Sequence, residues 1–464
     1  MTAARFLILG ATGDLAGRYL LPAFAELIAS RCLPDETEIV GVAREAWDDA
    51  RFQAHVTERL TAHAAKVSPS SRASLVQRVR YVSGDVTDPE TLWRARSGAA
   101  GPLIAYLALP PAVFPPVLSA LADPGLGGAI RVVVEKPFGT DLASARHLNH
   151  LLTQGFPEES VFRIDHFLGL QTVQNILGLR FANRLFEPLW CSAHIERVDI
   201  IWDETVALEG RAGYYDDTGA LRDMIQNHLL QLLCLVAMER PDGLGERPLR
   251  DAKVQVLRAV RRFDDDEVRR HTARARYTAG SVDGRGVPDY VAETGVDPAR
   301  GTETYAEVTM FVDNERWNGV PFRLRTGKAL GTDRREIRIG FRPTERLPFG
   351  QAHDPGPNAL TLGMDPDRLW ADLALNGAGD PFCLEPARWQ LDLAAQELSA
   401  YARLLLDIIG GDPSLSIRGD EAEACWEIVE PVLAAWKAGA TAIQTYPAGS
   451  TGPSASPSRA DRLG

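Results

Sequence analysis

The first 165 residues alternate short apolar runs with longer amphipathic segments, and this alternation restricts the possible folds more than any other feature of the sequence. Short apolar runs between turn residues are typical of buried strands, and helical periodicity separates most of these runs. Strands that alternate with helices predict a parallel, doubly wound α/β sheet. The expected strands are Arg5–Gly10, Glu38–Ala43, Val79–Val86, Leu103–Leu109 and Ile130–Glu135.

After about Asp165 the pattern changes to long helical segments followed by runs with strand character. Helices are expected over Thr218–Glu239 and over Leu391–Ile409. This order predicts a larger α+β domain with a mainly antiparallel sheet. Its expected strands are Val254–Val260, Thr302–Val312, Phe322–Arg325 and Glu336–Phe341.

The 464-residue chain is therefore expected to divide into two domains and a tail. The doubly wound domain covers residues 1–165, and the α+β domain covers residues 166–446. Residues 447–464 are rich in Pro, Gly, Ser and charge, so they cannot bury a core and are expected to be disordered.

Composition and charge exclude several classes of protein. The net charge of −12 argues against a general nucleic-acid binder, and no apolar run approaches the roughly 20 residues that span a bilayer. The N-terminus lacks the features of a secretory signal, so a cytoplasmic protein is expected. The five cysteines are scattered without a C-x-x-C pair, and His147 and His150 have no third ligand in view, so no metal is expected.

A glycine turn follows the first expected strand and leads into a helix. This order places backbone N–H groups against a pyrophosphate, although the spacing here is G-x-x-G, and glycines also serve ordinary tight turns. The second strand ends at Arg44, where NAD sites usually carry an acid, so a cation there favours the 2′-phosphate of NADP. The expected cofactor contacts on the turn are Gly10, Thr12, Gly13, Asp14 and Leu15.

Seven motifs stand in the order found in one family, and together they cover nearly the whole chain, from about residue 5 to residue 446. On these motifs the chain resembles the glucose-6-phosphate dehydrogenases. The motifs are GATGDLAG at 10–17, Gly41–Arg44, Val134–Gly139, Phe162–Gly169, Glu209–Asp216, Asp223–His228 and Leu324–Lys328.

The resemblance implies a Rossmann domain, a second domain whose sheet commonly forms a homodimer interface, and NADP or NAD as the hydride acceptor. Oxidation of a sugar hydroxyl needs a base for the O–H proton and a group that stabilises the protonated base. By resemblance His228 is the base, Asp165 stabilises it, and Lys136 binds the substrate near the reacting carbon. Pro137 matches the proline beside the nicotinamide.

Three further charged residues match sugar contacts of the family. They are Glu209, Asp223 and Lys328. Each could instead be a surface charge or part of a local salt bridge, and Asp165 or Asp223 could simply cap a helix. A lone helical histidine such as His228 is also more often structural than catalytic.

The sequence departs from the family where the substrate phosphate is held. The family signature R-I-D-H-Y-L-G-K retains its histidine as His166, but Phe167 replaces the tyrosine and Leu170 the lysine. Family lysines are also replaced by Gly17 and Tyr19, and a further lysine beyond R-T-G-K is replaced by Asp333.

These losses predict a substrate without the 6-phosphate, because a phosphate leaving water needs several charge-assisted hydrogen bonds. The expected substrate is a free sugar, a sugar derivative or a nucleoside that contacts Phe167, Leu170 and Tyr19. The alternative is an ordinary glucose-6-phosphate dehydrogenase in which Arg18, Arg180 or Arg334 rebuilds the phosphate site.

Family chemistry predicts that C1 is oxidised to a lactone. Two alternatives remain open. Because the EKP triplet also occurs in dehydrogenases that oxidise other ring carbons, a secondary hydroxyl could be oxidised to a ketone. A catalytically silent regulatory homologue is the third possibility, and the retained Asp165, His228 and Lys136 argue against it.

Overall fold

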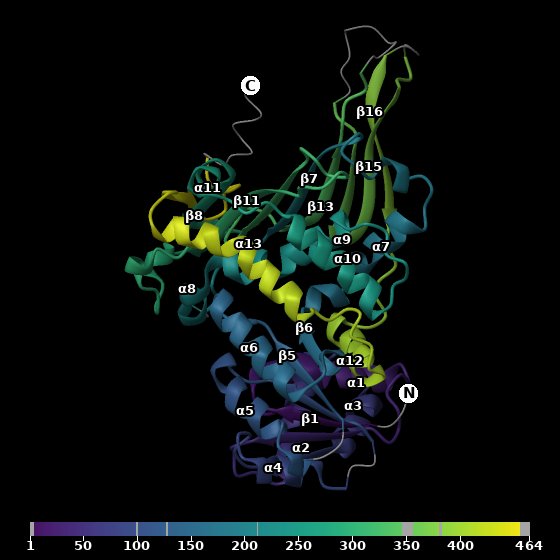
Figure 1. Cartoon of the computed structure of the whole chain (residues 1–464), viewed down its shortest axis with the longest axis vertical. Helices are drawn as coiled ribbons and strands as arrows, with labels where there is room; N and C mark the ends of the chain where they lie inside the picture. Colours follow the sequence, from purple (N-terminus) through teal and green to yellow (C-terminus); the bar gives the residue numbers. More distant parts are fainter. Residues whose placement is uncertain are drawn as a thin grey trace. The chain divides into compact units, whose positions relative to one another are not determined.

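The computed structural model describes residues 4–98, 101–126, 129–210, 212–345, 356–379 and 383–454 (Figure 1). It divides into two compact units, each made of several stretches of chain. Unit 1 comprises Met1–Gln171, Pro241–Asp251 and Gln396–Glu423, and unit 2 comprises Thr172–Arg240, Ala252–Ala395 and Ala424–Gly464. The sequence predicts two continuous domains, whereas unit 1 also includes two segments from much later in the chain.

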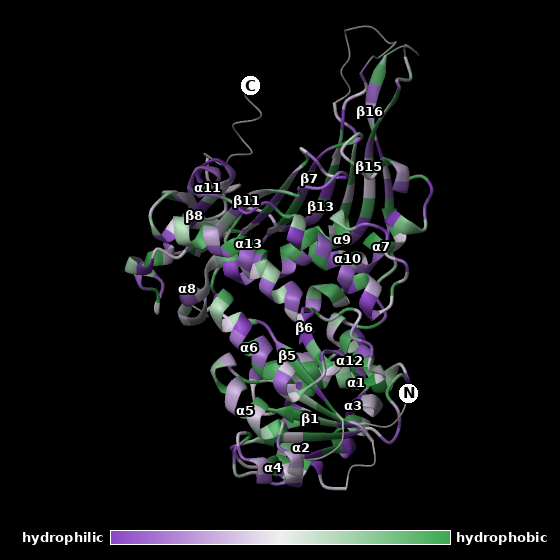
Figure 2. Cartoon of the chain, viewed as in Figure 1, coloured by the Kyte–Doolittle hydropathy of each residue, from purple (hydrophilic) through white to green (hydrophobic). Residues whose placement is uncertain are grey.

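Unit 1 contains a six-stranded sheet of order β3-β2-β1-β4-β5-β6, in which every neighbouring pair is parallel. This order is that of a dinucleotide-binding doubly wound fold, and it confirms the predicted Rossmann domain. The strands are completely or largely buried, and β1 is coloured as hydrophobic in Figure 2. They are β1 (Arg5–Leu9), β2 (Glu38–Ala43), β3 (Val79–Ser83), β4 (Leu103–Leu107), β5 (Ile130–Glu135) and β6 (Val161–Ile164).

The helices of unit 1 pack in two groups. One group, α1, α2, α3 and α12, shares a single apolar core with β1, β2 and β4, and α12 lies beside α1 (Figure 1). In the other group, α5 contacts both α4 and α6. The helices are α1 (Leu21–Ala29), α2 (Asp49–His63), α3 (Pro69–Arg78), α4 (Pro89–Arg96), α5 (Phe114–Leu121), α6 (Leu142–Gly155) and α12 (Ala400–Gly410), with short helical turns η1 (Ala16–Leu20) and η5 (His166–Gly169).

Unit 2 contains a nine-stranded sheet among its described residues, of order β16-β15-β14-β13-β7-β12-β11-β8-β17. All neighbouring pairs are antiparallel except β7 with β12 and β8 with β17. The predicted α+β fold with a mainly antiparallel sheet is therefore confirmed. The strands are β7 (Ile195–Asp203), β8 (Thr272–Thr278), β11 (Tyr305–Phe311), β12 (Pro321–Gly327), β13 (Arg334–Phe341), β14 (Ala359–Met364), β15 (Asp367–Asn376), β16 (Leu384–Asp392) and β17 (Ile443–Pro447).

Several helices accompany this sheet, and a short hairpin is formed by β9 (Gly280–Val282) and β10 (Arg285–Val287). The division between the units falls inside α10 (Glu246–Ala259) and α13 (Gly419–Lys437), and after the first residue of α7 (Gln171–Phe181). The helices are α7 (Gln171–Phe181), α8 (Ala212–Ala220), η7 (Leu221–Leu229), α9 (Leu230–Ala237), α10 (Glu246–Ala259), α11 (Asp265–His271) and α13 (Gly419–Lys437).

Two predicted elements are wrong. The expected strand Val254–Val260 belongs to helix α10, whose buried residues Leu249, Ala252, Val256 and Leu257 recur with helical spacing. The alternating valines suggested a strand because a short apolar run does not distinguish the two states.

The expected helix Leu391–Ile409 is wrong in its first half, and α12 confirms it over Ala400–Ile409. Its first two residues end strand β16, and helix α12 begins only at Ala400. The Ser399 hydroxyl oxygen accepts a hydrogen bond from the Ala402 N–H at 3.3 Å, so a side-chain cap sets the start of the helix.

The tail is ordered over its first residues. Pro447 ends strand β17, Ala448 is buried, and the Gly449 N–H donates to the Ala329 carbonyl at 2.8 Å. Disorder is therefore wrong for residues 447–454, while residues 455–464 lie outside the described part of the chain. Among the described helices, none combines the length and apolar character that crossing a membrane requires.

Candidate active site

The glycine turn after β1 has a backbone that only glycine fits well. Gly10 adopts φ +90°, and its N–H donates to the Val42 carbonyl at 2.8 Å. A Cβ atom at this position would lie 2.4 Å from the carbonyl oxygen of Ala108. The Gly13 N–H closes the turn on the Gly10 carbonyl at 3.0 Å. Helix η1 follows directly, so the turn fits the pyrophosphate of a dinucleotide at a helix N-terminus.

Gly17 serves a different purpose on the same turn. A Cβ atom at Gly17 would lie 2.2 Å from the Nε of Arg59, so the glycine makes room for this guanidinium. Arg59 reaches over from α2 and pairs with Asp14 at 3.0 Å. Arg59 therefore places a cation where the family has a lysine and this chain has Gly17. The sequence did not identify Arg59, and the glycine inside a helical segment was the available signal.

Arg44 follows β2 at the position predicted for cofactor recognition. Its side chain is 73% exposed, and its Nη2 lies 3.0 Å from the Oδ2 of Asp85. Asp85 follows β3 and accepts hydrogen bonds from the Thr87 N–H and hydroxyl. These hydrogen bonds, together with Arg44, lower the pKa of the Asp85 carboxyl. The residue is therefore fully ionised at neutral pH.

The EKP segment follows β5 and contains a buried carboxyl. Glu135 is 9% exposed and accepts hydrogen bonds from the hydroxyls of Tyr106 and Tyr401. Burial raises the pKa of Glu135 to about 7, while the two tyrosines and Lys136 act in the opposite direction. Lys136 and Pro137 are half-buried, and the peptide bond between them is cis.

Glu135→Gln is expected to change the pH dependence of stability. The folded pKa lies above the ordinary value of 4.5, so Glu135 contributes most to stability below pH 4.5 and loses this contribution as pH rises through about 7. Gln keeps an acceptor oxygen for the tyrosine hydroxyls and does not titrate. Between pH 5 and pH 8 the wild-type free energy of unfolding should fall relative to the variant by up to about 3 kcal/mol. Urea denaturation measures this difference, and Glu90→Gln on the exposed start of α4 is the control.

Asp165 and His166 follow β6. Asp165 is 1% exposed, and its Oδ1 accepts a hydrogen bond from the Phe167 N–H at 3.0 Å, so it caps the turn η5. The capping role considered from the sequence is therefore real, and it does not occupy the whole carboxylate. Phe167 is 3% exposed and Leu170 is half-buried, so Phe167 presents little open surface.

Three aromatic rings of unit 1 form a stack beside this turn. The His166 ring lies parallel to Tyr401, with centroids 5.8 Å apart and an interplanar angle of 12°. Tyr19 stacks on Tyr401 at 5.1 Å, and Tyr19 is 46% exposed. Tyr401 belongs to α12, which is far from His166 in the sequence. Its ring stacks on His166, and its hydroxyl donates a hydrogen bond to Glu135.

In unit 2, Asp223 and His228 lie on η7, which is a π-helix rather than the expected α-helix. Its turns close between residues five apart, so these two positions lie on the same side of the helix. An α-helix would place them about 140° apart. His228 is 1% exposed, and the Leu221 N–H at the start of η7 donates to the buried carboxylate of Glu303 at 2.9 Å.

One buried tyrosine, Tyr215, interacts with both Lys328 and Asp223. The sequence assigned no role to it. The Lys328 Nζ lies 5.3 Å from the ring centroid of Tyr215 and 2.6 Å from Glu204 Oε2. Burial and the charge of Asp223 raise the pKa of Tyr215 well above its usual value. Glu209, by contrast, is exposed in the loop before α8 with φ +45°.

The arginines considered for a rebuilt phosphate site differ in availability. Arg180 is 2% exposed and donates to the carbonyls of Leu235 and Met238. Arg334 pairs with Glu336 at 2.7 Å. Arg18 is half-exposed and lies 3.5 Å from the carboxylate of Asp14, so it is the least committed of the three.

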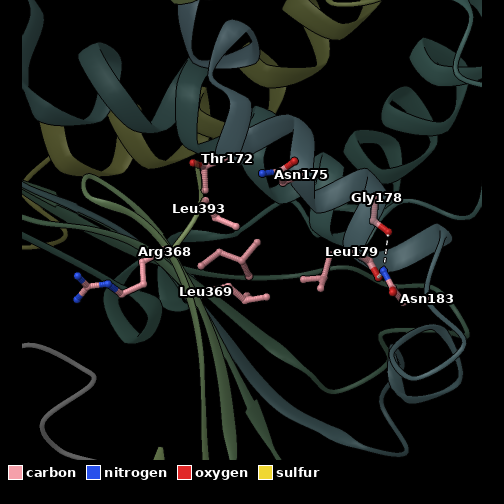
Figure 3. A pocket seen from close by; sticks show the side chains of 9 residues that line it. Thr172, Asn175, Gly178, Leu179, Asn183, Arg368, Leu369 and Leu393 are labelled. Carbon is pink, nitrogen blue, oxygen red and sulfur yellow. Dashed lines mark hydrogen bonds between the residues drawn. The ribbon is translucent and has the colours of Figure 1, made fainter. Parts of the chain in front are cut away.

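Unit 2 also contains an apolar cavity of about 240 Å³ between α7 and the sheet (Figure 3). The Asn183 amide donates to the Gly178 carbonyl at its edge. No substrate or cofactor residue expected from the sequence lines this cavity. Its lining residues are Thr172, Asn175, Gly178, Leu179, Asn183, Leu362, Arg368, Leu369 and Leu393.

Two family models cover almost the entire chain. Residues 7–175 match the glucose-6-phosphate dehydrogenase NAD binding domain, and residues 177–463 match the glucose-6-phosphate dehydrogenase C-terminal domain. The chain belongs to the glucose-6-phosphate dehydrogenase family. It is therefore an oxidoreductase of the sugar-phosphate dehydrogenase type, and unit 1 binds NADP.

Full-length relatives agree with this assignment. The glucose-6-phosphate 1-dehydrogenases of Treponema pallidum and Gluconobacter oxydans are each 42% identical to this chain, covering 97% of it and 92% and 94% of themselves. A solved glucose-6-phosphate dehydrogenase in complex with its substrate glucose-6-phosphate superposes with a TM-score of 0.88 at 32% identity. The alignment covers 97% of this chain and 96% of that one. The Mycobacterium avium glucose-6-phosphate 1-dehydrogenase superposes with a TM-score of 0.85 at 34% identity over 98% and 96%.

The roles of individual residues remain predictions. Within unit 1 the structure brings together the glycine turn and Arg44 at one edge of the sheet, and His166 with Tyr19 at the aromatic stack. Within unit 2 it brings Asp223 and Lys328 to Tyr215. The pairing of Asp165 with His228 joins residues of different units and is part of the proposal below.

Proposed function

We propose that this chain oxidises glucose 6-phosphate at C1, giving the lactone and NADPH. The proposal is carried by the full-length similarity to proteins named glucose-6-phosphate 1-dehydrogenase, together with retention of the residues that perform the chemistry. Those residues are His228, Asp165 and Lys136. The comparisons favour glucose 6-phosphate as the substrate over the unphosphorylated substrate that the sequence predicts.

In the proposed mechanism His228 removes the proton from the C1 hydroxyl. Asp165 stabilises the imidazolium that results, and Lys136 donates a hydrogen bond to the substrate near C1. Bound NADP supplies the hydride acceptor. The glycine turn would hold its pyrophosphate through backbone N–H groups, and Pro137 would pack beside its nicotinamide. Asp223, Glu209 and Lys328 hold the sugar hydroxyls in position.

The phosphate is proposed to bind at His166. Stacking on Tyr401 maintains the orientation of the His166 ring, so less conformational entropy is lost when a substrate binds. Arg18 is the proposed second cation, because its neighbour Tyr19 belongs to the same stack and its own carboxylate partner is exposed.

A second candidate function has a specific observation in its favour. Phe167 and Leu170 remove a hydroxyl and a cation from the phosphate-binding signature, and an unphosphorylated sugar or nucleoside would not need either group. The same base and cofactor would serve such a substrate.

Steady-state kinetics on a substrate panel decides between these functions. We expect kcat/KM for glucose 6-phosphate to exceed that for glucose and for nucleosides at least 100-fold. The reverse order would establish the second candidate, and NADP binding without NADPH formation on any substrate would indicate a silent homologue. A product that opens in water is a lactone, whereas a stable product of the same mass is a ketone.

A His166→Asn variant tests the phosphate contact. Its KM for glucose 6-phosphate should rise about tenfold, while its KM for unphosphorylated glucose should not change. Equal changes for both sugars would contradict a role of His166 in binding the phosphate.

We also propose that the chain forms a homodimer through its large sheet. Leu373 and Leu375 on β15 and Trp389 and Leu391 on β16 are 39–58% exposed. The strand register pairs odd-numbered residues of both strands, so all four side chains lie on one face. An apolar face of this kind is typical of a protein interface.

Trp389→Asp should therefore convert the dimer to monomers in sedimentation velocity experiments. The matched control is Trp93→Asp, since Trp93 is 56% exposed on α4 of unit 1. A wild-type chain that sediments as a monomer would contradict this proposal.

A further inference from the structure

Two proposed functional side chains of unit 2 depend on an unusual helix. Asp223 and His228 lie on η7, and its π-helical turns place them on the same side. Helices of this kind are rare and occur mostly as single turns, whereas η7 is nine residues long. A side chain that maintains this geometry therefore controls how the base is presented.

The start of η7 is bound by Glu303, which lies just before strand β11. Its Oε1 accepts a hydrogen bond from the Leu221 N–H at 2.9 Å, and its backbone carbonyl accepts one from the Ala220 N–H at 3.1 Å. In a continuous α-helix these N–H groups bind carbonyls four residues earlier. At this point Glu303 supplies acceptors from outside the helix, and it is only 7% exposed.

Gly219 makes room for the Glu303 carboxylate. The φ of Gly219 is +73°, which interrupts the helix before η7. A Cβ atom at this position would lie 2.7 Å from Glu303 Oε1. The break in the helix and the position of the carboxylate are therefore fitted to each other.

The segment that carries Glu303 also binds the backbone of Lys328. The carbonyl of the next residue, Thr304, accepts a hydrogen bond from the Lys328 N–H at 2.9 Å. The Thr304 N–H donates to the Ala275 carbonyl on β8 at 2.8 Å, so the segment is anchored to the sheet. Glu303 and Thr304 therefore hold η7 and Lys328 from one point of unit 2.

The end of η7 that carries the base is held by a side chain of the helix itself. The His228 N–H donates to Asn227 Oδ1 at 2.6 Å, and the Asn227 amide donates to the Arg222 carbonyl at 3.0 Å. These bonds stay within η7 and can form wherever the helix begins. The start of η7, by contrast, depends on Glu303, which is remote in the sequence.

We propose that Glu303 is a positioning residue, which maintains the π-helical start of η7 and thereby orients His228 and Asp223 toward the substrate. Glu303 itself touches neither substrate nor cofactor. This role rests on the proposed function, in which His228 is the base.

Two substitutions of Glu303 test the proposal in the full chain. Glu303→Ala leaves the Leu221 N–H without its acceptor, whereas Glu303→Gln keeps an acceptor oxygen. We expect kcat on glucose 6-phosphate to fall about 30-fold in Glu303→Ala, because a small misplacement of a catalytic group is costly. Glu303→Gln should retain kcat within about threefold of wild type. Calorimetry should show unchanged NADP⁺ binding in both variants, since unit 1 binds the cofactor.

A double-mutant cycle with His228→Asn distinguishes positioning of the base from a loss of folded protein. If Glu303 acts through His228, Glu303→Ala should lower kcat less than about threefold in the His228→Asn background. The same loss in both backgrounds would overturn the proposal, and so would wild-type kcat in Glu303→Ala. The matched control is Glu293→Ala, which removes another carboxylate acceptor of unit 2, that of the Tyr277 hydroxyl at 3.1 Å, and should retain wild-type kcat.

Hydrogen exchange supplies a readout that needs no activity. The peptide that contains Leu221 should exchange about tenfold faster in Glu303→Ala than in wild type and in Glu303→Gln. Unchanged exchange in Glu303→Ala would overturn the proposal. If another sugar or a nucleoside proves to be the substrate, the proposed function fails, and the same cycle on that substrate still decides the role of Glu303. A chain inactive on every substrate would refute both.

Discussion

Replacing His228 with asparagine should lower kcat about 10²- to 10⁴-fold and leave KM nearly unchanged. This loss is the usual contribution of a positioned general base. Asparagine is polar and smaller than histidine, so it fits the buried position without introducing a charge. It cannot accept a proton at neutral pH, and the hydroxyl proton of the sugar then has no acceptor.

Steady-state kinetics measures this effect, and calorimetric titration with NADP⁺ shows whether the cofactor site remains intact. His150→Asn, on the exposed face of α6, is the control and should retain wild-type kcat. Full activity of His228→Asn would remove this residue from the mechanism and leave the family assignment untouched.

Replacing Gly10 with alanine should abolish measurable NADP⁺ binding and destabilise unit 1 by about 3 kcal/mol. Two effects add. The φ of +90° is unfavourable for any residue with a Cβ atom, and that atom would lie 2.4 Å from the Ala108 carbonyl oxygen. The turn must shift to relieve the contact, and its N–H groups then no longer converge on the pyrophosphate.

Gly98→Ala separates these two effects. Gly98 has a similar φ of +82°, but among the described residues a Cβ atom there would meet only the Arg5 side chain, at 3.9 Å. This control should cost about 1 kcal/mol and leave NADP⁺ binding unchanged. Thermal melting and calorimetry measure both quantities. If the two alanine variants behave alike, backbone conformation alone explains the loss and the close approach to Ala108 has no role.

The local hydrophobic pattern was sufficient to predict the strands of the Rossmann domain. Residues such as Phe6, Ile39 and Val133 are completely buried, and such strands read as continuous apolar runs. The glycine turn and Arg44 were recognisable for the same reason, because they follow these strands directly. The seven motifs added the residues of unit 2.

Tertiary contacts explain what the sequence analysis missed. Tyr401 lies more than 200 residues from His166, and nothing in its surroundings indicates that it stacks on that ring. Arg59 is likewise one of many surface arginines until Gly17 makes room for it. The pairing of Asp85 with Arg44 became visible only when the strand order placed the ends of β2 and β3 next to each other.

The π-helix η7 illustrates a different limit. Its sequence has the periodicity of an amphipathic helix, and the sequence predicts a helix over Thr218–Glu239 without distinguishing a π-helical turn from an α-helical one. The wider turn begins after Gly219, whose φ of +73° breaks the helix, and beside Glu303, which accepts from its first N–H. Glu303 lies just before strand β11, about 80 positions later, so local sequence could not predict this hydrogen bond.

Unit 1 is built from separate stretches of the chain, and this affects how it folds during synthesis. Helix α12 packs its Leu405 and Ile408 side chains into the same core as α1, and the Arg131 guanidinium binds the carbonyls of Ile408 and Ile409. On the ribosome, the nucleotide-binding half therefore waits for nearly the entire chain before its core can close. All six strands of its sheet are complete by Ile164, but the part of the core that α12 fills stays open while the residues of unit 2 are synthesised. Apolar surface that stays exposed during synthesis is prone to aggregate until the late segment covers it.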